Sequence, residues 1–153
     1  MKKLIQSVFY EVTTLNQASA KLISLFGTIK SDGNVGRIGY VAGIINSEGL
    51  EFAERNHKRL AYYTRFLRKQ HRFPIFSSPD IFTDNVYKRL QEMQMPFIER
   101  EQKFYIFWRS LLSSGHITDI FMTPHWKVSK GAVDEHETAK KKGLKIHYLA
   151  NLL

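Results

Sequence analysis

Hydrophobic positions along the chain fall into short apolar runs that alternate with longer stretches of helical spacing. The short runs are bounded by Gly, Pro or Ser, which is typical of buried strands; they span 37–43, 73–76, 119–123 and 144–149. The longer stretches predict helices; they span 48–70, 82–93, 97–112 and 131–142. Strands that alternate with helices predict an α/β fold in which helices cover both faces of a parallel sheet.

The first 36 residues precede this alternation. Apolar positions between Leu15 and Phe26 have helical spacing, and Gly27 predicts the C-terminal end of that helix. Residues 31–36, Ser-Asp-Gly-Asn-Val-Gly, are typical of a turn. We therefore expect residues 1–36 to be an N-terminal extension that packs on a domain formed by residues 37–153.

Composition limits the class of protein. A chain of 153 residues that is 43% hydrophobic and 13% aromatic fits one globular domain and argues against intrinsic disorder. No apolar segment approaches the roughly 18 residues of a membrane span, and the basic start is not followed by the apolar region of a secretory signal. The absence of cysteine excludes disulfides, zinc ribbons and thiol chemistry. We expect a cytoplasmic protein without a membrane partner.

The net charge of +9 favours a partner that carries phosphate, on nucleic acid, a lipid surface or a small nucleotide. Basic residues are densest from Arg55 to Arg72, where Tyr62, Tyr63 and Phe66 are interleaved with them. Such a mixture can stack on single-stranded bases. The basic residues of this run do not all share one helix face, so a solvated surface is the default interpretation. Nucleic-acid binding remains a less favoured hypothesis.

Parallel sheets bind ligands beyond the carboxyl ends of their strands, an edge formed here by residues 43–46, 77–80 and 123–129. After the third strand, Ser129 is placed to cap the next helix, and Gly131 allows close approach of its backbone. Asp134 and Glu135 lie near the positive end of that helix, whose dipole favours an ionised carboxylate. Such a carboxylate can stabilise or attack a developing oxocarbenium ion, while the helix N-terminus with Ser129 holds a phosphate. Alternatively, these acids only stabilise the helix.

Several segments resemble the nucleoside 2-deoxyribosyltransferase-like superfamily. Residues 39–44, Gly-Tyr-Val-Ala-Gly-Ile, look like its opening strand and loop, and Asn56, Arg59 and residues 76–79 follow in the order of that pattern. The most specific similarity is to a D-x-x-x…W-x-x-S-x-G-A-x-x-E-x-x-x-A signature of small members of this group. Its positions are occupied by Asp119, Trp126, Ser129, Gly131, Ala132, Glu135 and Ala139.

The resemblance implies a flavodoxin-like or Rossmann-like fold and hydrolysis or deoxyribosyl transfer at the N-glycosidic bond of a nucleoside or nucleotide. It implies that Glu135 is the nucleophile, that Tyr40 is a second catalytic residue, and that Tyr40 and Gly43 line the base and sugar part of the cleft. Relatives that hydrolyse 2′-deoxynucleoside 5′-phosphates have a phosphate-contacting serine at the position of Ser129, which favours a nucleotide. The remaining candidates for substrate binding are Trp126, Gly131, Ala132 and Asp119. Because such relatives build their clefts beside a neighbouring subunit, we expect a homo-oligomer of two or more chains.

One departure separates this chain from the pattern. Relatives place an aspartate that assists the leaving base in the helix before the Asp119 strand, but residues 108–112 read Trp-Arg-Ser-Leu-Leu. Asp80 and Asp84 are alternatives for that acid. A protein that binds nucleotides without turning them over is therefore the second hypothesis. The chain has no dinucleotide, ATP-loop or esterase motif, and His136 and Glu137 point to different helix faces. We expect no cofactor and no metal.

Overall fold

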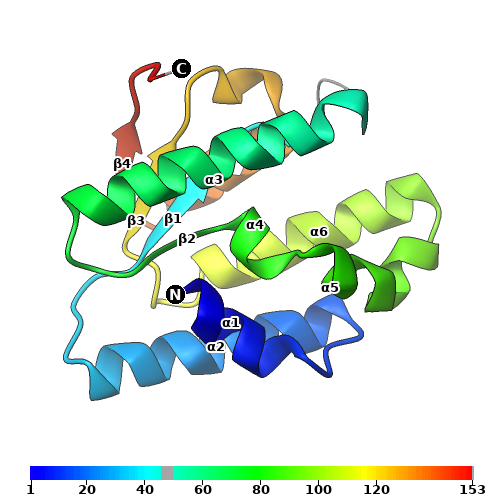
Figure 1. Cartoon of the computed structure of the whole chain (residues 1–153), viewed down its shortest axis with the longest axis horizontal. Coiled ribbons are helices and arrows are strands. Elements are labelled where there is room, and N and C mark those ends of the chain that lie inside the picture. Colours follow the sequence, from blue (N-terminus) through cyan, green and yellow to red (C-terminus); the bar gives the residue numbers. More distant parts are fainter. Residues whose placement is uncertain (46–49, 153) are drawn as a thin grey trace.

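The computed structural model of the chain describes residues 1–45 and 50–152, so Asn46 of the predicted edge loop and Glu48 at the predicted helix start lie outside the described residues. The described residues contain one parallel sheet with the strand order β2-β1-β3-β4. Its strands are β1 (Gly39–Ala42), β2 (Ile75–Ser77), β3 (Asp119–Met122) and β4 (Lys145–Tyr148). Helices lie on both faces of this sheet (Figure 1), which confirms the predicted α/β, Rossmann-like fold.

Seven α-helices and three short 3-10 helices occur in the described parts of the chain. The α-helices are α1 (Lys2–Phe9), α2 (Leu15–Asp32), α3 (Ala53–Gln70), α4 (Ser78–Ile81), α5 (Asp84–Arg89), α6 (Phe97–Leu112) and α7 (Lys130–Lys141). The 3-10 helices are η1 (Leu50–Phe52), η2 (Gln91–Gln94) and η3 (Trp126–Val128). None of these helices is long and apolar enough to cross a membrane.

Two hydrophobic layers enclose the sheet. On one face, α3 packs Leu60, Tyr63 and Leu67 against Val41 and Phe121. The opposite face belongs to a larger core to which α1, α2, α6 and α7 contribute. Every residue of β1 and β3 is buried, because a strand covered on both faces has no solvent side. This explains why the apolar runs in the sequence are continuous rather than alternating.

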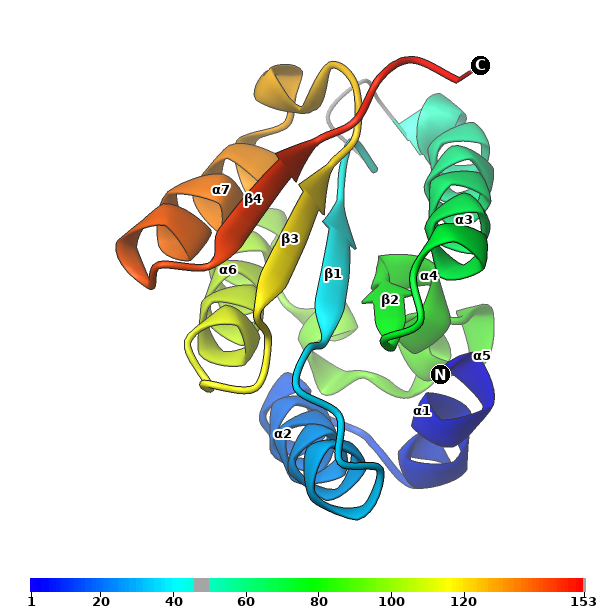
Figure 2. The same ribbon diagram turned by 90° about the vertical axis from the view of Figure 1, so that its left-hand side faces the viewer.

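The chain leaves the centre of the sheet in two directions. β1 connects through α3 to β2, and the chain then passes through α4, α5 and α6 to β3, on the other side of β1. The switch point therefore lies beyond the carboxyl ends of β1 and β3, where such folds bind ligands. Figure 2 shows these ends at the top of the view and the N-terminal helices α1 and α2 at the opposite end.

At this switch point the two strands lie in close contact. Thr123 Oγ1 donates a hydrogen bond of 3.0 Å to the carbonyl oxygen of Ala42. A Cβ atom added at Gly43 would overlap the same Thr123 Oγ1. A side chain at position 43 therefore fits only if the Thr123 side chain or one of the two loops moves.

The N-terminal segment is more helical than the sequence predicted. The side chain of Thr14 caps α2 by accepting a hydrogen bond from the backbone N–H of Gln17. α2 does not end at Gly27 but continues to Asp32, so this prediction was wrong. A Cβ atom at Gly27 would lie 3.4 Å from the His116 ring, which is an ordinary van der Waals contact. How the chain divides into domains remains a prediction.

The predicted helix over 82–93 is instead two short helices, α5 and η2. Leu90 between them has an extended backbone. The N–H of Gln91 donates to the carbonyl oxygen of Thr13 at 2.8 Å, and Glu92 Oε1 accepts from the N–H of Leu15 at 2.8 Å. These bonds tie the segment to the connection between α1 and α2, and this tertiary constraint outweighs the local helical spacing.

Candidate functional site

Tyr40 and Glu135, the two predicted catalytic residues, meet on the α7 side of the sheet. The Tyr40 hydroxyl donates a hydrogen bond of 3.1 Å to Glu135 Oε1. The Tyr40 ring stacks on Trp108 of α6, with ring centroids 4.7 Å apart. Tyr40 is 2% exposed and Glu135 is 7% exposed. The fold therefore brings together two residues that are far apart in sequence and places them in a largely apolar environment.

Burial controls the protonation of this pair. It raises the pKa of Glu135 to about 8, although the hydrogen bond from Tyr40 partly opposes the shift. Burial, followed by the neighbouring Glu135, also raises the pKa of Tyr40 well above its usual value. At neutral pH the Glu135 carboxyl is mostly protonated. The expectation that the helix dipole keeps this carboxylate ionised was therefore wrong, because desolvation dominates.

Ser129, Gly131 and Ala132 form the start of α7 beside this pair. Ser129 is the N-cap, and its Oγ accepts a 3.2 Å hydrogen bond from the N–H of Ala132. This bond confirms the predicted cap and leaves the Ser129 hydroxyl hydrogen available for a ligand. A Cβ atom at Gly131 would have no neighbour nearer than 3.8 Å. Packing within the chain therefore does not require glycine at position 131.

Trp126 lies in η3 and packs on α7. Its ring stacks on His136 with centroids 4.3 Å apart, and His136 Nε2 is 2.8 Å from the hydroxyl of Tyr148 on β4. Within the described residues, the buried Nδ1 of His136 has no hydrogen-bond partner. The aromatic contacts hold the loop after β3 against α7. Whether Trp126 contacts a ligand stays a prediction.

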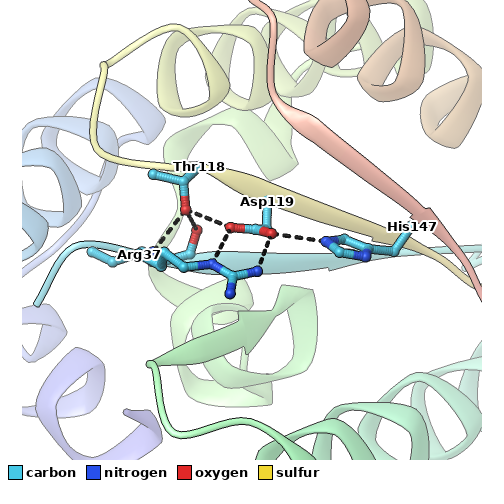
Figure 3. A network of polar contacts seen from close by, with 5 residues as sticks. Arg37, Thr118, Asp119 and His147 are labelled. Atoms are coloured by element: carbon cyan, nitrogen blue, oxygen red, sulfur yellow. Dashed lines mark hydrogen bonds and ion pairs between the residues drawn. The ribbon is translucent and has the colours of Figure 1, made fainter.

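Asp119 is not part of the Tyr40–Glu135 pair. It begins β3 and lies on the opposite, α3 side of the sheet, next to Phe121 in the strand alternation. Figure 3 shows Arg37 donating two hydrogen bonds to its carboxylate, at 3.1 and 2.7 Å. Thr118 Oγ1 donates to the same group at 2.6 Å, and His147 Nε2 lies 2.8 Å from it.

This network fixes the charge of Asp119. Burial of the carboxyl raises its pKa, but the hydrogen bonds from Arg37, Thr118 and His147 together outweigh burial and hold the pKa well below its usual range. The side chain links β3, β4 and the segment before β1. Its placement indicates a structural role, and its predicted part in substrate binding gains no support from these contacts.

The acid that is missing from residues 108–112 has no evident replacement. Arg109 of α6 pairs instead with Asp134 of α7, with Arg109 Nε 2.9 Å from Asp134 Oδ2. Asp80 is buried and accepts hydrogen bonds from Arg68 Nη2 at 2.8 Å and from the N–H of Ser77 at 2.9 Å. Asp84 lies exposed in the first turn of α5.

A basic cavity on the α3 side of the carboxyl edge was not predicted. Its volume is about 570 Å³, and it is lined by Arg55, Lys58, Arg59, Tyr62, Arg65, His125 and Asn151. The five α3 residues recur at helical spacing and share one face; Arg55, Lys58 and Arg65 are exposed, as the interpretation of a solvated surface predicted. The basic run as a whole, which continues to Arg72, does not have this spacing. Tyr63 is fully buried beneath the helix.

No group of three or more His, Asp or Glu side chains is arranged to hold a metal ion within residues 1–45 and 50–152. The resemblance drawn from the sequence remains a hypothesis about family. Comparison with known proteins gave no match to this chain among protein-family models, curated proteins or solved structures.

Proposed function

We propose that the protein binds a nucleoside 5′-monophosphate and cleaves its N-glycosidic bond, with Glu135 as the reacting carboxyl group. The observation that carries this proposal is the 3.1 Å hydrogen bond between Tyr40 and Glu135. It joins the strand next to the switch point to the second turn of α7, whose N-terminus is suited to an anion. A buried carboxyl with a strongly raised pKa in such a place is a typical catalytic group.

In this mechanism Glu135 acts as the nucleophile. Its proton must leave first, and the resulting carboxylate is poorly solvated and therefore reactive, with Tyr40 still donating to it. The carboxylate attacks the anomeric carbon, the carbon–nitrogen bond breaks, and the base leaves with the bonding electrons and takes a proton from solvent. Water then cleaves the glycosyl ester and releases the sugar phosphate. A second base in place of water would give transfer.

The start of α7 supplies groups for the 5′-phosphate. In the first turn of α7, the N–H groups of Ala132 and Val133 bond to Ser129. The N–H groups of Lys130 and Gly131 have no intrahelical partner, and Ser129 adds a hydroxyl donor beside them. Lys130 brings a positive charge to the same turn. Together with the helix dipole, these groups favour a bound dianion.

The decisive experiment compares wild type with Glu135→Gln and Glu137→Gln on a panel of ribo- and deoxyribonucleoside 5′-monophosphates. Gln at position 135 keeps the shape and hydrogen bonding of the side chain but cannot attack. Glu137 is an exposed acid on the same helix and serves as the matched control. We expect chromatography to show free base with wild type and Glu137→Gln, and a loss of at least about 10³-fold with Glu135→Gln.

Nucleotide binding by Glu135→Gln should persist, because the phosphate groups are unchanged. Full activity of Glu135→Gln would show that Glu135 is not the nucleophile.

Binding without turnover is the second candidate function. Two observations favour it: α6 offers Arg109 rather than an acid near α7, and Glu135 is mostly protonated at neutral pH. On the same panel it predicts saturable binding by wild type with no free base from any nucleotide, with or without an acceptor base.

A further inference from the structure

The basic cavity beside α3 is a site that the N-glycosidic proposal does not use. It lies on the α3 side of the sheet, whereas Tyr40 and Glu135 lie on the α7 side. Four cationic side chains of α3 line it, and its described lining residues include no acid, although Lys58 pairs with Glu54 at the start of α3, at 2.8 Å. The like charges of Arg59 and Arg65 repel each other across the hollow, and a bound anion would relieve this repulsion.

Arg59 is the central residue of this cavity. Within the described parts of the chain, its buried Nε has no hydrogen-bond partner. A buried, unsatisfied guanidinium N–H is costly and is explained by a ligand that supplies the acceptor. Arg59 also borders a small hollow beside Thr123 and Pro124 at the switch point. It therefore connects the cavity to the edge at which parallel sheets bind ligands.

The loop after β3 brings His125 to the same cavity. His125 has a left-handed backbone conformation with φ of 64°. For a residue other than glycine this conformation is strained, and such strain is concentrated at functional sites. The ring of Tyr62, which is 38% exposed, lines the same cavity. Two flat rings therefore accompany the cationic groups.

We propose that this cavity binds a compact ligand with two or more phosphate groups, of the nucleoside di- or triphosphate class. Its volume of about 570 Å³ falls within the range of small-molecule sites. Residues from two other segments, His125 and Asn151, line the same hollow as the cationic groups of α3, and this enclosure favours a compact polyanion over a nucleic-acid strand. Guanidinium groups of Arg59 and Arg65 bind phosphate oxygens, and the Tyr62 ring stacks on the base.

Calorimetric titration of the full chain with inorganic triphosphate and with a nucleoside triphosphate tests this proposal. We expect both to bind, with Arg59→Met and Arg65→Met each raising the Kd at least about tenfold. Lys69→Met removes a charge from the same helix outside the cavity and should change the Kd less than about twofold. Tyr62→Ala should weaken only the nucleoside triphosphate, because inorganic triphosphate has no base to stack.

Arg65 is exposed, so its substitution leaves the fold intact even if Arg59→Met does not fold. Absence of binding at low salt would overturn the proposal, as would an equal loss in Lys69→Met. It would also be overturned if a single-stranded oligonucleotide bound more tightly than the triphosphates and depended equally on all basic residues of α3. Glu135→Gln should bind triphosphate as wild type does. Triphosphate binding in the basic cavity can therefore fail or succeed independently of N-glycosidic cleavage at Glu135.

Discussion

At the scale of single residues, the most informative side chain is Glu135. Its pKa is raised from 4.5 to about 8 mainly by burial, so the folded state binds its proton more tightly than the unfolded state. The stabilisation from this proton is complete below pH 4.5 and is lost as the pH rises to about 8. The contribution of Asp119 to stability has the opposite pH dependence, because the pKa of its carboxyl is lowered in the folded state. This contribution is present above pH 3.8 and is lost in acid.

This linkage gives a prediction about Glu135→Gln. A neutral amide has no proton to lose, so the variant should unfold at a higher temperature than wild type at pH 8. The gap should be a few kcal/mol, on the order of 5–10 °C in Tm, and should shrink toward pH 5. Thermal unfolding followed by circular dichroism across this pH range measures it. Glu137→Gln, at an exposed position, should have the same Tm as wild type at every pH. A difference in Tm between Glu135→Gln and wild type that does not change with pH would contradict the raised pKa of Glu135.

At the scale of elements, the two loops at the switch point depend on the contact between Gly43 and Thr123. The loop after β1 passes close enough to the loop after β3 that a side chain at position 43 has no space. Leu60 of α3 also lies 3.3 Å from the position of the missing Cβ. This packing holds β1, β3 and α3 together at the edge that borders the basic cavity.

Gly43→Ala therefore forces the Thr123 side chain or the loop to move. We expect the free energy of unfolding to fall by about 1–3 kcal/mol, as for other overpacked sites, and to be measured by denaturant unfolding. Gly36→Ala is the matched control, since a Cβ there meets no atom within 4 Å, and it should change stability by less than about 0.5 kcal/mol. Equal effects of the two substitutions would show that the close approach is not a constraint.

At the scale of the whole molecule, the N-terminal helices share the core of the sheet. Phe9 of α1 and Phe26 of α2 belong to the same buried cluster as Tyr40 and Phe107. Phe26 packs directly on Phe76 of β2, with ring centroids 4.9 Å apart. These contacts lead us to expect that the N-terminal segment unfolds together with the sheet.

Phe9→Ala tests this expectation. Removing a ring that is 1% exposed should destabilise the protein by about 3–5 kcal/mol. Circular dichroism and tryptophan fluorescence should report the same lowered midpoint if the core is one cooperative unit. Leu4→Ala, at a position that is 49% exposed on the same helix, should have little effect. An early transition seen only by circular dichroism would instead indicate an independently folding N-terminal segment.

The sequence by itself determined the alternation of strands and helices, the parallel sheet and the Ser129 cap, because these follow from local periodicity and turn chemistry. Tertiary structure alone decided the rest. The break around Leu90 comes from hydrogen bonds to the distant segment around Thr13 and Leu15. Protonation of Glu135 depends on desolvation by α6, α7 and the sheet. Convergence of Arg59, His125 and Asn151 on one cavity likewise requires the folded chain, because no local pattern encodes distances between segments so far apart.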